Sequence, residues 1–228
     1  MTQIIPSIVN KKIYAVLTGD LVGSSRFNIE KQRDEVLLAL KDSFKIIESI
    51  DIIASNFEIH RGDSFQGVLS KPEAALKTAI IIRSNLLSKF KGKRIHLDAR
   101  IAIGIGTIDY LPKEHVGEGD GEAFRNSGTE LDKMKKGEQR LIVKTPWHNV
   151  NDELQTECVL LDSLIQRWTK EQAEAILYQI HGLKQEEIAK ILGISQPAVF
   201  QRLKTASYWS LQAFLERFKT IVQYNVLE

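Results

Sequence analysis

The stretch of residues 183–206 near the C-terminus limits the possible folds of this chain more than any other part of it. Residues 185–192 are expected to form a helix with one apolar stripe, made of Ile188, Ala189, Ile191 and Leu192. Gly193 follows, where a helix can stop and the chain can turn sharply, and Ile194 is expected to be buried at the turn. Ser195 is a natural N-cap for a second helix, and Pro197 falls in its first turn, where a missing N–H costs little. A helix, a glycine turn and a second helix predict a helix-turn-helix, whose second helix enters the DNA major groove.

The second predicted helix has an apolar inward face, expected at Val199 and Leu203, and an outward face that is mostly polar and basic. No acidic residue lies between Glu187 and Glu216, so the presented helix carries only positive charge. Glutamine, arginine and lysine are side chains that contact bases and phosphates. The residues predicted to bind double-stranded DNA are Gln196, Pro197, Phe200, Gln201, Arg202, Lys204 and Thr205.

An ordinary helical hairpin would share much of this periodicity. We favour DNA binding because the spacing of Ala189, Gly193 and Val199 satisfies the restrictive positions of the motif. Two alternatives stay open within the motif. Arg202 can lie near base edges or at the junction between helices, and Phe200 can touch a thymine methyl group or be half-buried.

The same stretch resembles the helix-turn-helix of sigma-factor region four and of related response regulators. Their recurring pattern "GLxxEEIAxxLGIS…V..RL..A" is matched here at residues 182–183, 186–189, 192–195, Val199, 202–203 and Ala206. Lys184 is a departure, because those families usually have a capping Ser or Thr at that position. This departure weakens the expected start of the first helix.

The composition restricts where and how such a protein can work. The net charge is only +2, so any DNA affinity must come from the local placement of charge. A single cysteine, Cys158, excludes an internal disulfide and fits a reducing cytoplasm; its apolar surroundings predict a core position. No apolar run reaches the length of a membrane span, and the five scattered histidines make a zinc site improbable.

The first 145 residues alternate between strand and helix patterns. Strands are expected at residues 12–20, 55–60, 64–69, 96–105 and 140–144, and helices at 28–50, 72–89 and 122–135. The order β-α-β-β-α-β, then α-β, predicts an α+β, ferredoxin-like domain, an antiparallel sheet with helices on one face.

After Thr145 the sequence reads as entirely helical. We expect residues 1–145 to form the ferredoxin-like domain, 146–168 a helical linker, and 169–228 an all-α helix-turn-helix domain. Thr169 and Gln172 predict a capping box at the start of the scaffold helix. The second motif helix is expected to continue past Leu203 as one long helix. Its apolar face is too long for one small domain to cover, so this face is expected either to pack on the first domain or to pair two chains. A single weakly basic DNA-binding helix makes few phosphate contacts, which predicts a homodimer.

Two acids, Asp20 and Asp63, are expected close together, since one ends the first strand and the other lies at the tip of a neighbouring hairpin. Paired carboxylates at a sheet edge can hold a divalent metal, and Mg²⁺ held in this way binds nucleotide phosphates. The spacing alone favours the simpler interpretation, in which both are turn acids that bond their own backbone.

Residues 13–144 resemble the catalytic domain of class III nucleotide cyclases. "TGDLVGSSRF" parallels "FADIVGFT", "IHRGDSFQGVLSKPEAALKTAI" parallels "KTIGDAFMAVF…PEDAVRAA", and "LDARIAIGIG" parallels "LRVRIGIHTG". The resemblance implies Asp20 and Asp63 as metal ligands, with the backbone carbonyl of Leu21, and Mg²⁺ with a nucleotide as the ligand. The nucleotide-binding residues that it suggests are Gly23, Ser24, Ser25, Arg61 and Arg125.

Other cyclase positions are not matched. The base-reading Lys falls on Ile59, and the Asn and Arg that orient ribose and steady the transition state fall on Arg125 and Thr129. Losing such a donor typically costs ~10²–10³-fold in rate. The chain resembles the SatD family more closely, through "TGDLVGSS", "RGDSFQG", "GEAFRNSG" and "LDSLIQRWTKEQAEAI". That family resembles reduced cyclase-type domains, some joined to a C-terminal helix-turn-helix.

These features rank three hypotheses. The first is a DNA-binding transcription regulator with a degenerate cyclase-like domain that senses or dimerises. The second is a metal-dependent nucleotide cyclase or nucleotidyl-transfer enzyme that the helical domain regulates, against which Ile59 and Thr129 speak. The third is a silent domain that binds a nucleotide and signals to the DNA reader.

Overall fold

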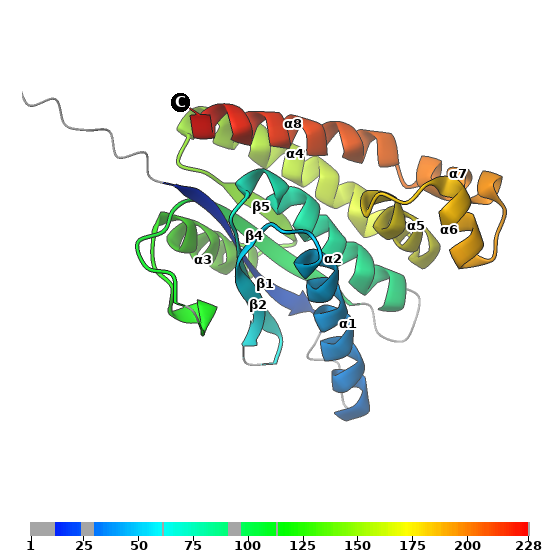
Figure 1. Ribbon diagram of the computed structural model, residues 1–228, viewed down its shortest axis with the longest axis horizontal. Helices are drawn as coiled ribbons and strands as arrows, with labels where there is room; N and C mark the ends of the chain where they lie inside the picture. The colour runs from blue at the N-terminus through cyan, green and yellow to red at the C-terminus, as the bar shows by residue number, and fades with distance from the viewer. Residues whose placement is uncertain (1–11, 24–29, 61, 91–96, 113, 228) are drawn as a thin grey trace, which may run out of the picture.

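A computed structural model describes residues 12–23, 30–60, 62–90, 97–112 and 114–227 of the chain. It joins a sheet domain to an all-helical C-terminal region (Figure 1). The strands are β1 (Ile13–Val22), β2 (Ile53–His60), β3 (Ser64–Leu69), β4 (Asp98–Thr107) and β5 (Leu141–Lys144). The predicted α+β class is confirmed.

The sheet has the order β2-β3-β1-β4-β5. Strand β1 lies in the middle and pairs antiparallel with both β3 and β4, and β3 pairs antiparallel with β2. This is the predicted ferredoxin-like connectivity. Strand β5 adds a parallel pair at the edge of β4.

Helices α1 (Glu30–Glu48) and α2 (Ala75–Phe90) cover one face of the sheet, and α3 (Glu122–Met134) covers the other (Figure 1). The prediction that helices lie on one face is therefore wrong for α3. Gly104 of β4 explains the difference, because a Cβ atom there would lie 2.2 Å from the carbonyl oxygen of Ala123 in α3. A residue with a side chain would keep α3 off this face. Two 3₁₀ turns, η2 (Pro72–Ala74) and η3 (Val116–Glu118), complete the domain.

The C-terminal region consists of α4 (His148–Arg167), α5 (Lys170–Ile180), α6 (Gln185–Leu192), α7 (Gln196–Thr205) and α8 (Tyr208–Leu227). Cys158 is fully buried, as predicted, and Thr169 with Gln172 forms the predicted capping box at the start of α5. Across the described part of the chain, no helix combines the length and the apolarity that a membrane span needs.

The prediction of one long helix after Leu203 is wrong, because the chain breaks between α7 and α8. The indole N–H of Trp168 donates a hydrogen bond of 2.8 Å to the carbonyl oxygen of Ala206, which a continuing helix would have used internally. Ser207 then takes a left-handed conformation, with φ 59°. Helix α8 consequently turns back and runs beside α4 (Figure 1).

One apolar core runs through both parts of the chain. It includes Leu17 of β1, Ile80 of α2 and Trp168 at the end of α4, all at most 2 % exposed. Helix α2 is buried on nearly all sides, since it lies between the sheet on one side and α5 and α8 on the other.

Four charged residues, Arg83, Asp98, Arg140 and Asp162, form a cluster inside this core. Arg83 of α2 is completely buried and binds Asp98 of β4 through two hydrogen bonds of 3.0 and 2.8 Å. Its Nη1 donates to Asp162 of α4 at 2.7 Å, and Arg140 donates to Asp98 at 2.9 Å. Burial alone would lower the pKa of Arg83, but the two carboxylates outweigh it and raise that pKa. The charge cluster thus joins α2 and β4 of the sheet domain to α4, which follows much later in the chain.

We expect Asp162→Ala to destabilise the fold strongly. Removing one partner from a buried ion pair leaves an uncompensated charge and costs about 3–5 kcal/mol. Urea unfolding followed by circular dichroism should therefore show a loss of about 3 kcal/mol or more in the free energy of unfolding. Asp152→Ala, on the exposed side of the same helix, is the matched control and should change it by less than about 0.5 kcal/mol. Equal effects of the two substitutions would contradict the assigned role of the charge cluster.

The cluster also predicts a direction of pH dependence. Burial would raise the pKa of Asp98, but the charges and hydrogen bonds of Arg83, followed by Arg140, hold it below 3.8. A carboxyl whose folded pKa is lowered stabilises the protein fully above its unfolded pKa, and that contribution is lost as pH falls through the folded value. Carbon NMR should place the midpoint of the Asp98 carboxyl below 3.8, in the range where the free energy of unfolding declines. A midpoint above 3.8 would show that the ion pairs do not form.

Candidate DNA-binding site

Local backbone bonds build the predicted helix-turn-helix from α6 and α7. The side chain of Glu187 accepts a hydrogen bond of 2.7 Å from the backbone N–H of Lys184, so α6 has a capping interaction although Lys184 supplies none. Gly193 ends α6 in a left-handed conformation, with φ 64°. Ser195 begins α7, and its hydroxyl accepts the backbone N–H of Ala198 at 3.4 Å. The sharp turn thus follows from the residues predicted to make it.

The inner face of the motif is as predicted at its central positions. Val199 and Leu203 of α7 are fully buried, and Ile188 of α6 is fully buried as well. Ile191, which was expected on the same apolar stripe, is instead 54 % exposed. Helix α6 is so short that only one narrow side of it faces α5 and α7, and Ile191 lies off that side. Ile194, expected to be buried, is half-buried.

The outer face of α7 presents most of the predicted DNA-binding residues to solvent. The exposed ones are Pro197, Phe200, Gln201, Lys204 and Thr205. Within the described chain, the side chains of Gln201 and Lys204 have no hydrogen-bond or ion-pair partner. They lie three positions apart, on the same side of the helix. Gln196 is half-buried, and its amide donates to the side chain of Gln185 at 2.6 Å, which ties α7 to α6.

Two of the predicted residues turn toward the scaffold helix α5. Arg202 is 25 % exposed in its side chain, and its Nη1 lies 3.7 Å from Oε2 of Glu174. The hydroxyl of Thr205 accepts a hydrogen bond of 2.9 Å from Gln172. The structure thus places Arg202 at the helix junction. Sequence reasoning missed Glu174 because an acid in the middle of an amphipathic helix carries no signal of its partner.

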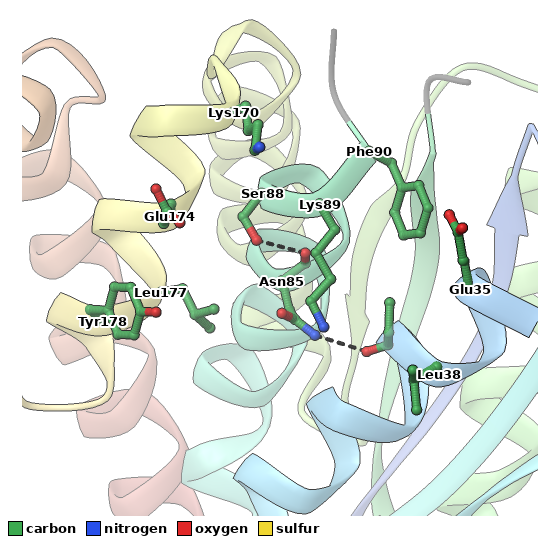
Figure 2. Close-up of a pocket in the computed structure, with 11 residues that line it drawn as sticks. Glu35, Leu38, Asn85, Ser88, Lys89, Phe90, Lys170, Glu174, Leu177 and Tyr178 are labelled. Atoms are coloured by element: carbon green, nitrogen blue, oxygen red, sulfur yellow. Dashed lines mark hydrogen bonds between the residues drawn. The ribbon is translucent and has the colours of Figure 1, made fainter. Parts of the chain in front are cut away.

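Glu174 also borders a groove of about 410 Å³ between α1, α2 and α5. Figure 2 shows residues that line this groove, with Lys170, Glu174 and Tyr178 on α5 and Ser88 and Lys89 on α2. The side-chain amide of Asn85 on α2 donates a hydrogen bond of 2.8 Å to the backbone carbonyl oxygen of Ala39 in α1 (Figure 2). Helix α5 therefore contacts α2 of the sheet domain on one side and α7 on the other.

The arrangement of α5, α6 and α7 defines a helix-turn-helix protein. Residues 158–207 match the family described as sigma-70, region 4, which spans the end of α4 through the turn after α7. No curated protein matches the chain. A helix-turn-helix of the sigma-70 region 4 type suggests DNA binding, and this part of the predicted resemblance is confirmed. The match does not reach the sheet domain.

Asp20 and Asp63 lie side by side at one end of the sheet. Asp20 stands opposite Ser64 in the β1–β3 register, and the backbone N–H of Leu21 donates to the carbonyl oxygen of Asp63 at 2.9 Å. Arg100 of β4 donates to Oδ2 of Asp20 at 3.1 Å. The other oxygen of Asp20, Oδ1, is buried and has no partner among the described residues. Burial, opposed by the charge of Arg100, raises the pKa of Asp20 above 3.8.

This pair of acids fits only one kind of metal site. Among the described residues, no group of three or more histidines, cysteines and acids is placed to hold a metal by itself. Mg²⁺ needs fewer protein ligands, because it commonly takes one or two carboxylates, with water and substrate phosphates completing its shell. The buried Oδ1 of Asp20 suits such an ion, whereas the hydrogen bond from Arg100 competes with it at Oδ2.

The predicted nucleotide contacts do not all gather here. Ser24, Ser25 and Arg61 lie outside the described residues. Gly23 follows β1 directly, with φ 93°. Arg125 lies in the first turns of α3 and pairs with Asp120 and Asp109 at 2.7 and 3.3 Å.

Arg125 and the two acids lie toward opposite ends of the sheet. The start of α3 approaches Gly106, which pairs with Tyr14 at the far end of β1 from Asp20. Asp20 lies six positions beyond Tyr14 along the strand, about 20 Å at 3.3 Å per residue. Arg125 is thus held by its own loop and away from the acids.

A cleft of about 480 Å³ opens near the end of the sheet that carries the acid pair, although neither Asp20 nor Asp63 lines it. Ser64, the register partner of Asp20, lines it together with Thr18 and Gln66. The amide of Gln66 donates to the hydroxyl of Thr18 at 2.8 Å, and that hydroxyl also bonds Ser127 of α3 at 2.9 Å. The hydrogen-bonding groups of Thr18 and Gln66 that line the cleft are therefore held in place, near the end of the sheet that carries Asp20 and Asp63.

Proposed function

We propose that this protein is a DNA-binding transcription regulator, in which α7 is the recognition helix. The observation that supports this most strongly is the outer face of α7, where Gln201 and Lys204 are exposed and no acid occurs from Ile188 to Leu215. In this proposal Gln201 and Pro197 lie near base edges, and Lys204 contacts a phosphate. Gln196, Arg202 and Thr205 contribute by fixing α7 against α6 and α5.

We further propose that the chain works in three parts: residues 1–145 sense or dimerise, 146–168 connect, and 169–228 bind DNA. The resemblance to the SatD family supports this division. A recognition helix with few basic residues makes few phosphate contacts, so specific binding is expected from a homodimer on two spaced half-sites.

Substitution of the proposed DNA face should weaken binding in a defined way. Gln201→Ala should reduce discrimination between sequences by about 1–3 kcal/mol, the typical value of one good side-chain contact to a base. Lys204→Ala should weaken binding to all sequences and lower the salt dependence by about one unit. The measurement is fluorescence anisotropy with duplexes selected from random sequence, over a range of salt concentrations.

Lys219→Ala is the matched control, because it removes the same charge from an exposed position on α8. If affinity and salt dependence are the same for Lys204→Ala and Lys219→Ala, the assigned face of α7 is wrong. If the wild-type protein selects no duplex at all, the proposed function itself is wrong.

A second candidate function concerns the sheet domain. We infer that the acid pair and the nearby cleft lined by Thr18, Ser64 and Gln66 bind a nucleotide with Mg²⁺, and that the helical region responds to it. The support is the buried Oδ1 of Asp20, which has no hydrogen-bond partner among the described residues and lies beside Asp63. Bound Mg²⁺ would neutralise phosphate charge. A cyclase or nucleotidyl-transfer enzyme is less favoured. Ile59 and Thr129 stand where cyclases carry the base-reading Lys and the Arg that steadies the transition state, and Arg125 is paired with Asp120.

Nucleotide binding is tested by thermal unfolding with Mg²⁺ and ATP or GTP. A ligand at 100 times its Kd stabilises the folded protein by about 2.7 kcal/mol, so the melting temperature of the wild type should rise by about 5–10 °C. Asp63→Ala should abolish the rise. Asp132→Ala, an exposed acid on α3, should retain it. A rise of equal size in Asp63→Ala, or none in the wild type with either nucleotide, would refute this candidate.

A further inference from the structure

Three aromatic side chains meet beside the recognition helix. The rings of Phe200 and Trp209 are 5.5 Å apart and inclined at 64°, and those of Tyr208 and Trp209 are 6.0 Å apart at 71°. Such edge-to-face geometry is attractive between aromatic rings. Phe200 nevertheless remains 42 % exposed and Trp209 48 % exposed. The contact therefore fixes the rings in place without hiding them from solvent.

The break between α7 and α8 creates this contact. In one continuous helix, Phe200 and Trp209 would be nine positions apart, and at about 100° per residue their side chains would project from opposite faces. They would also lie about 13 Å apart along the helix axis. The left-handed Ser207 instead redirects the chain, so that Trp209 returns to the side of Phe200.

Phe200 lies on the same outer face as Gln201 and Lys204, and it is exposed together with them. A partner that approaches the basic side of Lys204 therefore also meets the ring of Phe200. For an anionic partner such as duplex DNA, the apolar group accessible in the major groove is the C5-methyl of thymine. Helix α7 contains no acidic residue, which favours DNA as the partner over an apolar protein surface.

We propose that Phe200 reads thymine methyl groups in the DNA target and that Trp209 is the residue that positions its ring. This inference rests on the proposed DNA binding by α7 and adds the chemical feature that it recognises. Trp209 limits the orientations of the Phe200 side chain, so less conformational entropy is lost when the ring docks. The preferred target then contains thymine where the middle of α7 faces the groove.

The test replaces each thymine of a selected duplex, one at a time, by deoxyuridine, which pairs identically and lacks only the methyl group. Burying one methyl-sized group against an apolar ring corresponds to about a fourfold change in affinity. We expect one or two positions at which the replacement weakens wild-type binding by about fourfold. In Phe200→Ala the same replacements should have no effect. Fluorescence anisotropy at fixed salt measures both.

Substitutions of Trp209 distinguish a loss of ring positioning from a general loss of the fold. Trp209→Ala should reduce the deoxyuridine effect, whereas Trp209→Phe, which keeps an aromatic contact, should preserve it. Tyr224→Ala removes an exposed aromatic side chain far along the same helix and should leave the effect unchanged. Two results together would refute thymine reading by Phe200 and leave DNA binding intact: binding is lost in Lys204→Ala, and no deoxyuridine replacement weakens binding of the wild type. If the wild type selects no duplex, both are refuted.

Discussion

The buried charge of Arg83 is the constraint on which the rest of this structure depends. A guanidinium without solvent must be neutralised and fully hydrogen-bonded, because burying a charge without partners is very unfavourable. Asp98 supplies two of its bonds from the sheet, and Asp162 supplies a third from α4. An arginine on α2 therefore fixes the first C-terminal helix against the sheet domain, and the shared apolar core closes around this contact.

The position of α4 then determines the geometry of the DNA-binding motif. Trp168 follows α4 directly, and its indole N–H bonds the carbonyl of Ala206, which ends α7 and sends α8 back along α4. An ion pair of 2.9 Å between Arg217 and Glu153 joins these two helices further along. This series of contacts leads from the sheet to the exposed face of α7. A change in how the sheet domain holds α4 or α5 would thus reach the recognition helix through groups in direct contact.

The contacts around Asp20 and Asp63, at one end of the sheet, match the expected ones only in part. Asp20 and Asp63 are adjacent, as strand order alone indicated, yet Arg100 from the next strand bonds one of the two oxygens of Asp20. Arg125, expected from resemblance to serve a nucleotide, is paired with the acids of its own loop. These two contacts differ from those that the resemblance implied, because one arginine occupies an oxygen of Asp20 and the other is held by its own loop.

The sequence by itself determined the local features, where neighbouring residues decide the structure. The strand order of the first domain, the Gly193 turn, the Ser195 cap and the buried Val199 and Leu203 all follow from periodicity and backbone preference. Only the tertiary structure decided features that join distant residues. Arg83 with Asp162, Trp168 with Ala206, and Phe200 with Trp209 depend on packing across the fold, and no spacing along the chain encodes them. For that reason the break before α8 and the second helical face of the sheet could not be predicted. The helix-turn-helix could be, because its interactions span few residues.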